Sequence, residues 1–561
     1  MNGNLDSRKA VPLELLVYLV VLVIAAALRF SNLGGLPLTD HEASLALQAL
    51  RLSKGEQVLI SGEPGYIALT TLWFSLFEPS DFTARFWPAL AGTLLALTPL
   101  LYRERVGKAA ALVLAGLVAV DPIMIGASRS AEGSMLALLG LLAAVGFAMR
   151  SKPLWCGFAL GFALAGGPAL WPGVICLAVF LLINCKSLRQ VDNRFLALAA
   201  MTAMVTLVLL STLFLINPPG ISAFGSSLVD YWGSWRSENP APLKGIAAAW
   251  GSSTLLVLVL SIWSLIQGFV RGEARAKWLG IWAGAALALI LMNPARQLFD
   301  FSWATVPLLA LAAMKLVELF PSFSSDNRIV FIAETVLVVA LVVFSFMNAV
   351  NLVNNPLQSP EEYRNRAIGA VLPLFLLLGM TVLLAWGWSG ASTREGFIAG
   401  VLLLAGFFTL ANSIKAASLG SRPEIEIRRD LAAVVGSEEL LRTIQDISRA
   451  RTGIENRIDV LIVDLQSPSL EWALRSFEKA ETAAVFDPTA SPSLVITDVN
   501  QQITAGASYR GQKIIWQEEP DMKNMTIIDW LKWSFFRIAP LENREIILWA
   551  RNDLFPGGNI P

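Results

Sequence analysis

The sequence is poor in charge, in cysteine and in histidine. Charged residues make up 15% of its 561 positions, and 43 basic residues balance 43 acidic ones. Nucleic-acid-binding chains normally carry a clear basic excess, so this balance argues against a nucleic-acid partner. The three cysteines, Cys156, Cys176 and Cys185, lie in or beside apolar stretches, which excludes a disulfide framework and a zinc-finger spacing. The only histidine is His41.

Apolar residues, in contrast, are abundant. They form 55% of the chain, and the mean hydropathy is +0.59, which indicates a protein dissolved in lipid. About 20 apolar residues cross a bilayer as a helix, so the apolar runs predict about 13 spans. The predicted spans lie near residues 11–29, 84–102, 108–126, 131–149, 154–168, 170–185, 195–216, 246–270, 277–293, 298–319, 329–352, 367–388 and 395–414. The first run has no convincing cleavage site after it, so we expect an uncleaved span.

The short loops indicate the orientation of these spans. Basic residues recur at every second loop, including Arg8 and Lys9, Arg103 to Lys108, Arg150 and Lys152, Lys186 to Arg194, and Arg271 to Lys277. The positive-inside rule then predicts a cytoplasmic N-terminus and places everything after about residue 416 outside the cell membrane. Residues 64–79 are apolar enough for another span, but counting them would invert the basic loops. We therefore expect them to form a helix in the plane of the membrane surface.

The last part of the chain has a different, mixed pattern. An amphipathic helix is predicted over 428–451, a buried strand over 458–464, and a helix near 468–480. Short strands near 482–486, 493–498, 512–517 and 546–549, with a Trp-rich helix near 527–537, complete the pattern. The predicted fold is thus an all-α multi-span membrane domain over 1–415, whose first outer loop is 30–83, followed by a small soluble α/β domain over 416–561.

The first outer loop carries the strongest concentration of titratable side chains. Thr39 or Asp40 is well placed to cap a helix over about 41–53, but capping does not explain Glu42 and His41 beside it. A carboxylate at the membrane surface can act as a general base towards a lipid-borne substrate, and two close together can share a divalent cation. Asp40 and Glu42 are therefore the candidate catalytic residues, and Asp40, His41, Glu42 and Glu63 are the candidate ligands if a cation binds.

Other polar residues near predicted outer ends of spans allow two interpretations. Arg129 is either a phosphate ligand or the partner of Glu132 one helical turn away. Arg85 and Arg296 either bind an anion or simply extend towards the membrane surface. The outer loop at 230–238 mixes aromatic and charged residues, which suits sugar stacking and equally suits an interfacial aromatic belt.

The order and spacing of several fragments over residues 25–150 resemble the GT-C superfamily of membrane glycosyltransferases, in particular the protein O-mannosyltransferase and aminoarabinose-transferase group. The fragments are Leu28-Arg29-Phe30 with Gly35-Leu36-Pro37, Asp40-His41-Glu42-Ala43, Glu63-Pro64 before an aromatic helix, Phe82 to Ala89 with Arg85 inside, and Asp121-Pro122 to Ser128-Arg129. The C-terminal part is similar to the tail of a flippase-associated branch of archaeal-type glycosylation.

The resemblance implies a sugar donor carried on a polyprenyl phosphate and transferred, with inversion, on the outer face of the cytoplasmic membrane. The acceptor is a protein, a lipid or a glycan. Asp40 or Glu42 would deprotonate the acceptor hydroxyl, while Arg129 and Arg296 would stabilise the departing phosphate. His41, Glu63, Arg85 and Glu132 complete the expected substrate-binding set.

One departure from the family pattern keeps other functions open. The family has adjacent Asp and Glu, whereas this chain has Asp40-His41-Glu42, so His41 occupies the aspartate position when Glu42 is aligned. A catalytically silent GT-C-like protein that assists flipping or assembly of lipid-linked saccharides is the alternative. A transporter is a third reading, but the two halves of the chain lack matching Gly/Pro-broken spans.

Overall fold

The fold is described from a computed structural model covering residues 13–183, 192–237, 243–319, 327–354, 359–419 and 432–555, except residues 488, 490, 502–506, 523 and 537. Several residues used in the sequence analysis lie outside the described residues: Arg8, Lys9, Cys185, Lys186, Arg189, Glu238 and Arg428. The other two cysteines, Cys156 and Cys176, are buried free thiols.

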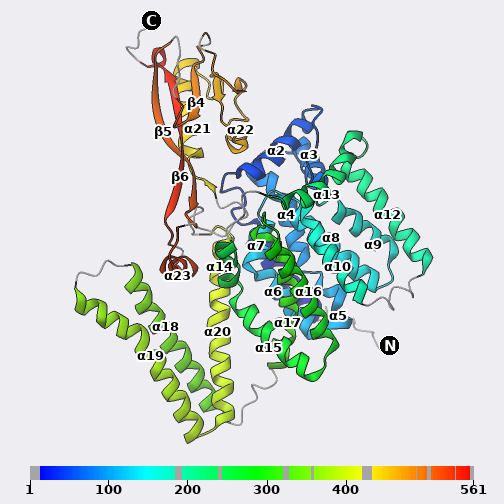
Figure 1. Ribbon diagram of the computed structural model, residues 1–561, viewed down its shortest axis with the longest axis vertical. Helices are drawn as coiled ribbons and strands as arrows, with labels where there is room; N and C mark the ends of the chain where they lie inside the picture. The colour runs from blue at the N-terminus through cyan, green and yellow to red at the C-terminus, as the bar shows by residue number, and fades with distance from the viewer. Residues whose placement is uncertain are drawn as a thin grey trace, which may run out of the picture.

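Helices dominate the first 416 residues (Figure 1). They are α1 (Leu13–Phe30), α2 (Asp40–Ser53), α3 (Pro64–Leu76), α4 (Asp81–Leu95), α5 (Pro99–Val106), α6 (Lys108–Val120), α7 (Pro122–Ser128), α8 (Ser134–Met149), α9 (Pro153–Leu164), η1 (Pro168–Leu170), α10 (Trp171–Ile183), α12 (Asn193–Ser211), η2 (Pro218–Ile221), α13 (Ser222–Ser234), α14 (Leu243–Ser253), α15 (Leu255–Arg271), α16 (Ala274–Met292), η3 (Leu298–Phe301), α17 (Ser302–Leu319), α18 (Arg328–Asn354), α19 (Pro360–Gly387) and α20 (Gly390–Ala416).

The chain is a multi-pass membrane protein. Among the described residues, seven helices are long and apolar enough to cross a bilayer, or up to nine if each sharply bent helix pair forms one span. Three shorter apolar helices, Ser134–Met149, Pro153–Leu164 and Pro168–Ile183, and helix α1 occupy the remaining predicted spans. A helix is therefore found at every predicted span. Helix α3 has 13 residues, fewer than a span needs, as expected for an in-plane helix.

Two breaks in the helices are set by local sequence. Helices α6 and α7 bend by 58° at Asp121-Pro122, where the Asp121 carboxylate accepts a hydrogen bond from the Met124 N–H and so caps α7. Between α9 and α10, Gly167 has a φ of +89°, which favours glycine, and Pro168 begins a short 3₁₀ turn. Gly167 and Pro168 thus interrupt the apolar stretch between α9 and α10.

The C-terminal domain stands at one end of the helical bundle, next to α2 and α3 (Figure 1). Its elements are β1 (Ala433–Val434), α21 (Ser437–Thr452), β2 (Val460–Val463), α22 (Pro468–Ala473), β3 (Ala480–Ala483), β4 (Leu494–Asp498), β5 (Tyr509–Pro520), α23 (Ile527–Phe536), β6 (Leu541–Arg551) and η5 (Asn552–Leu554). The strands form one mixed sheet in the order β1-β5-β6-β4-β2-β3. Strand β2 is parallel to β3 and β4, and the other pairs are antiparallel.

Two helix boundaries predicted for this domain are wrong. The helix predicted over 428–451 begins only at Ser437 in the described residues, because Ala433 and Val434 pair with β5 as a strand. The helix predicted near 468–480 ends at Ala473, because the chain must turn to place β3 in parallel register with β2. Strands β5 and β6 run longer than predicted, since each continues to pair with the other along its length.

Candidate functional site

The first outer loop is fixed by a capping box at the start of α2. The Glu42 N–H donates to Thr39 Oγ1 at 3.4 Å, and the Thr39 N–H donates to Glu42 Oε2 at 3.0 Å. Thr39 rather than Asp40 is therefore the N-cap, and Asp40 is the first helical residue. The carboxylate of Glu42 is directed back towards the start of its own helix.

Glu42 forms a buried ion pair with Arg85, and each residue is 4% exposed. Arg85 Nη2 lies 2.7 Å from Glu42 Oε2, Arg85 Nε lies 2.8 Å from Glu42 Oε1, and the Ala131 N–H donates to Oε1 at 2.8 Å. Burial alone would raise the pKa of Glu42, but the charge and hydrogen bonds of Arg85 and the backbone donors outweigh it and lower that pKa to about 2. This carboxylate is a poor proton acceptor, which counts against the predicted catalytic role of Glu42 and the anion-binding role of Arg85.

The Asp40 carboxylate is bound by the C-terminal domain. Its Oδ1 accepts hydrogen bonds from Ser467 Oγ at 2.9 Å, from Ser469 Oγ at 2.6 Å and from the Ser469 N–H at 3.0 Å. Its Oδ2 accepts one from Gln517 Nε2 at 2.7 Å. The structure thus directs Asp40 into an interdomain contact, and the group of possible metal ligands found among the described residues includes neither Asp40 nor Glu42.

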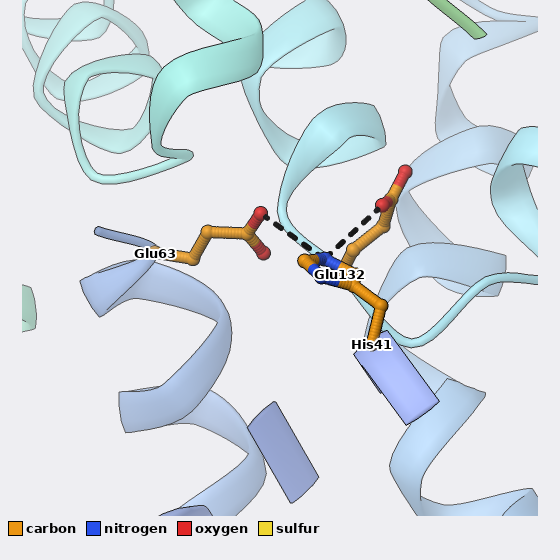
Figure 2. A group of neighbouring side chains, drawn as sticks. All are labelled: His41, Glu63 and Glu132. Carbon is orange, nitrogen blue, oxygen red and sulfur yellow. Dashed lines mark ion pairs between the residues drawn. The ribbon is translucent and has the colours of Figure 1, made fainter. Parts of the chain in front are cut away.

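A different triad gathers instead: His41, Glu63 and Glu132 (Figure 2). His41 Nε2 lies 3.9 Å from Glu63 Oε1 and 3.9 Å from Glu132 Oε2. One ligand atom from each residue lies within 4.8 Å of the others. Ligands 2.0–2.2 Å from a divalent ion lie within about 4 Å of one another, so a small closure would let this triad hold one.

Each member of the triad is held by its local structure. His41 lies in the first turn of α2, and Glu63 precedes Pro64 at the start of α3. The Gly133 N–H donates to Glu63 Oε2 at 2.8 Å, and Ser134 Oγ donates to Glu132 Oε1 at 2.5 Å. The connection between α7 and α8 therefore supplies one acid and orients the other.

Glu63 and Glu132 line a cavity of about 100 Å³. Asp230 on α13 and Asp300 on η3 line it too, so four carboxylates face one small space. The other polar lining residues among the described part of the chain are Ser134, Tyr231, Ser234, Asn293, Gln297, Ser302 and Trp303, with neither lysine nor arginine. Such a cavity attracts a cation or hydroxyl and amine donors and repels a bare anion.

The two arginines predicted to bind phosphate donate instead to backbone carbonyls. Arg129 Nη1 donates to the carbonyls of Arg29 and Ser31 at 3.0 and 2.7 Å, and Nη2 donates to that of Asn32 at 3.0 Å. Arg296 donates to the carbonyls of Ile290 and Leu291. These contacts tie loops to helix ends. Arg129 lies at the C-terminal end of α7, before α8 begins, so it does not share a helix with Glu132 as the alternative prediction required.

Sequence reasoning missed several residues of the site. Asp300 follows the start of a predicted span, and an acid near the outer end of an apolar run was a usable signal. Asp230 was noted only as part of an aromatic loop. Ser467, Ser469 and Gln517, which bind Asp40, carried no signal because they lie more than 400 residues away along the chain.

Comparisons with known proteins identify structures with a similar fold. No family model and no curated protein matches the sequence. The structure of the aminoarabinose transferase ArnT from Cupriavidus metallidurans bound to undecaprenyl phosphate is similar with a TM-score of 0.55 and 16% identity, covering 99% of this chain and 100% of ArnT. Its apo structure matches with a TM-score of 0.53 and 16% identity, covering 87% of this chain and 92% of that one.

A third similar structure is the Archaeoglobus fulgidus oligosaccharyltransferase tethered with an acceptor peptide. Its TM-score is 0.44, its identity is 13%, and the match covers 88% of this chain and 70% of that one. The likeness to ArnT over almost the whole length of both chains confirms the expected architecture, a multi-span helical domain followed by a small α/β domain. The chain therefore shares its fold with ArnT, which is a member of the GT-C superfamily.

Proposed function

We propose that this protein is a membrane glycosyltransferase that moves a sugar from a polyprenyl-phosphate donor to an acceptor on the outer face of the cytoplasmic membrane. The observation that carries the proposal is the acidic cavity beside the first outer loop, in a chain whose fold matches ArnT bound to undecaprenyl phosphate over 99% of its length. A polyprenyl chain stays in the bilayer because each buried CH₂ contributes about 0.8 kcal/mol, so its phosphate is presented at the membrane surface.

We further propose that His41, Glu63 and Glu132 hold a divalent cation. An imidazole nitrogen with two carboxylates is a common ligand set for zinc and similar ions. When bound, such an ion would attract the donor phosphate to a cavity whose own side chains repel it. A bound ion would supply the positive charge that the donor phosphate requires. The three predicted arginines have other contacts, because Arg85 pairs with Glu42, and Arg129 and Arg296 donate to backbone carbonyls.

The general base is reassigned from Asp40 and Glu42 to the carboxylates that line the cavity. Asp230 lines the same cavity as Glu63 and Glu132, so an acceptor hydroxyl that enters this cavity would meet its carboxylate. A carboxylate in this cavity can accept the proton of the acceptor hydroxyl while the acceptor oxygen attacks the sugar carbon. The bond between that carbon and the donor phosphate oxygen then breaks, the polyprenyl phosphate leaves, and the configuration at the carbon is inverted.

The test is transfer of radiolabelled sugar from a panel of polyprenyl-phosphate donors to endogenous acceptors in membranes that contain the protein. The variants are Glu63→Gln, Glu132→Gln and Asp230→Asn, and Glu438→Gln on the exposed face of α21 is the matched control. We expect turnover by the wild type and the control, and loss of about 100-fold or more in each cavity variant. Full turnover by the three cavity variants would refute the assignment of the site.

A catalytically silent role remains the second candidate, favoured by His41 at the aspartate position of the family pattern. Such a protein would bind a polyprenyl-phosphate saccharide in the same cavity without transferring the sugar. Binding of every donor in the panel with no transfer of label by the wild type would support this function over the transferase.

A further inference from the structure

The C-terminal domain contacts the first outer loop through the Asp40 carboxylate, which forms no ion pair with a basic side chain among the described residues. Four hydrogen bonds reach the Asp40 carboxylate, all from Ser467, Ser469 and Gln517. These three donors are 2%, 3% and 5% exposed, so the contact is built into the interior of the interface. Hydrogen bonds to a charged acceptor are about twice as strong as neutral ones.

The donors are themselves oriented from within the C-terminal domain. The indole N–H of Trp516, which is fully buried, lies 3.2 Å from both Ser467 Oγ and Ser469 Oγ. Gln517 follows Trp516 on strand β5. The sheet therefore fixes the position of the group that binds Asp40, and we call Ser467, Ser469 and Gln517 the Asp40 clamp.

Short helix α22 extends the same contact to the second outer segment. The Trp472 N–H donates to Asp81 Oδ1 at 2.7 Å, and its ring stacks on Phe74 at 5.9 Å between centroids. Arg475 donates to the Pro79 carbonyl at 3.3 Å. The C-terminal domain thus contacts the beginning of α2, which carries His41, and the connection between α3 and α4.

We propose that the C-terminal domain is a positioning part of the site, and that the Asp40 clamp sets the direction of His41 towards Glu63 and Glu132. Asp40 and His41 are the first two residues of α2, so the bonds that hold the Asp40 side chain also restrain the rotation of the first turn. Asp40 then acts as a positioning residue rather than as a base. The consequence for turnover rests on the proposed function, whereas the consequence for His41 does not.

The single histidine makes the orientation of His41 directly measurable. The full chain is labelled with ¹³C-histidine, carries no polyhistidine tag and is placed in lipid nanodiscs, so its NMR spectrum contains one imidazole signal. Asp40→Ala removes all four hydrogen bonds, and the triple variant Ser467→Ala, Ser469→Ala, Gln517→Ala removes them from the other side. Asp40→Asn keeps the shape and can be satisfied if the Gln517 amide turns over.

We expect the His41 signal to shift or split in Asp40→Ala and in the triple variant and to stay in place in Asp40→Asn. Arg51→Ala is the matched control, because Arg51 contacts Glu471 at 3.4 Å across the same interface but at an exposed edge of α2. Turnover should fall by about 100-fold in the two disruptive variants and survive in Asp40→Asn. Circular dichroism confirms that each variant is folded.

An unchanged His41 signal in folded Asp40→Ala and triple variants would overturn the proposal. Loss of turnover in Asp40→Asn with an unchanged signal would overturn it as well, because the carboxylate charge would then take part in the chemistry. If even the wild type transfers no sugar, the proposed function fails, but the NMR comparison still decides whether the clamp positions His41.

Discussion

Replacing Glu42 by Gln should test whether this acid supports the structure or performs the chemistry. The substitution keeps the size of the side chain and removes its charge. It leaves the Arg85 guanidinium buried opposite a neutral amide, with only the carbonyls of Leu33, Leu36 and Pro37 as further acceptors. A buried charge that loses its partner is strongly destabilising, because water no longer solvates it.

The magnitude follows from the pKa of Glu42. A fall from the ordinary value of 4.5 to about 2 corresponds to about 3 kcal/mol of stability at neutral pH, at roughly 1.4 kcal/mol per pKa unit. Loss of one partner of a buried pair costs about 3–5 kcal/mol, which agrees. The folded pKa is depressed, so this contribution is complete above pH 4.5 and disappears as the pH falls through about 2.

The assay is thermal unfolding of the purified protein in detergent, together with sugar transfer below the unfolding temperature. We expect Glu42→Gln to lower Tm strongly while the folded fraction keeps its turnover. Replacing both partners, as Glu42→Gln with Arg85→Met, should cost less than the sum of the single changes, because no charge is then left unpaired. An unchanged Tm with abolished turnover would refute this reasoning and restore Glu42 as the base.

Three further predictions concern the site and its orientation. Gly133→Ala should destabilise the protein by about 1–3 kcal/mol, because the added Cβ would lie 2.4 Å from the Gly166 carbonyl oxygen. It should also displace Glu63, which accepts a hydrogen bond from the Gly133 N–H. Gly116→Ala, whose Cβ would lie in open space, is the control for Tm and turnover. Zinc or manganese at 100 times its dissociation constant should stabilise the wild type by about 2.7 kcal/mol and leave His41→Ala unchanged in the same thermal assay. In intact cells, a membrane-impermeant thiol reagent should label the exposed Ser508→Cys variant but not the Ser151→Cys variant, whose residue lies between α8 and α9. The reverse pattern would contradict a C-terminal domain outside the membrane.

The membrane fold could be read from the sequence because the bilayer imposes one strong rule. Every backbone polar group in lipid must be satisfied within its own helix, so each span appears as an uninterrupted apolar run. The bend at Asp121-Pro122 lies inside one predicted span, 108–126, so the apolar pattern alone does not predict it. The C-terminal domain was harder, because the ends of α21 and α22 are decided by pairing with strands distant in sequence.

The local sequence does not predict which residues come together in the site. Glu132 is predicted either to bind substrate or to pair with Arg129. It lies in the connection between two helices, so its direction depends on how α8 packs. Asp300 and Asp230 reach the cavity from segments about 70 residues apart, and no periodic pattern reports that they meet. Only the packing of α13, η3 and the first outer loop brings the four carboxylates together.

The three consecutive residues Asp40, His41 and Glu42 show why spacing alone misassigned the roles. Each step along a helix turns the side chain by about 100 degrees, so three neighbours face three directions. Asp40 meets the C-terminal domain, His41 meets Glu63 and Glu132, and Glu42 meets Arg85. A titratable side chain in an aligned motif is therefore available for chemistry only on the face that packing directs towards the other site residues, and in this chain that residue is His41.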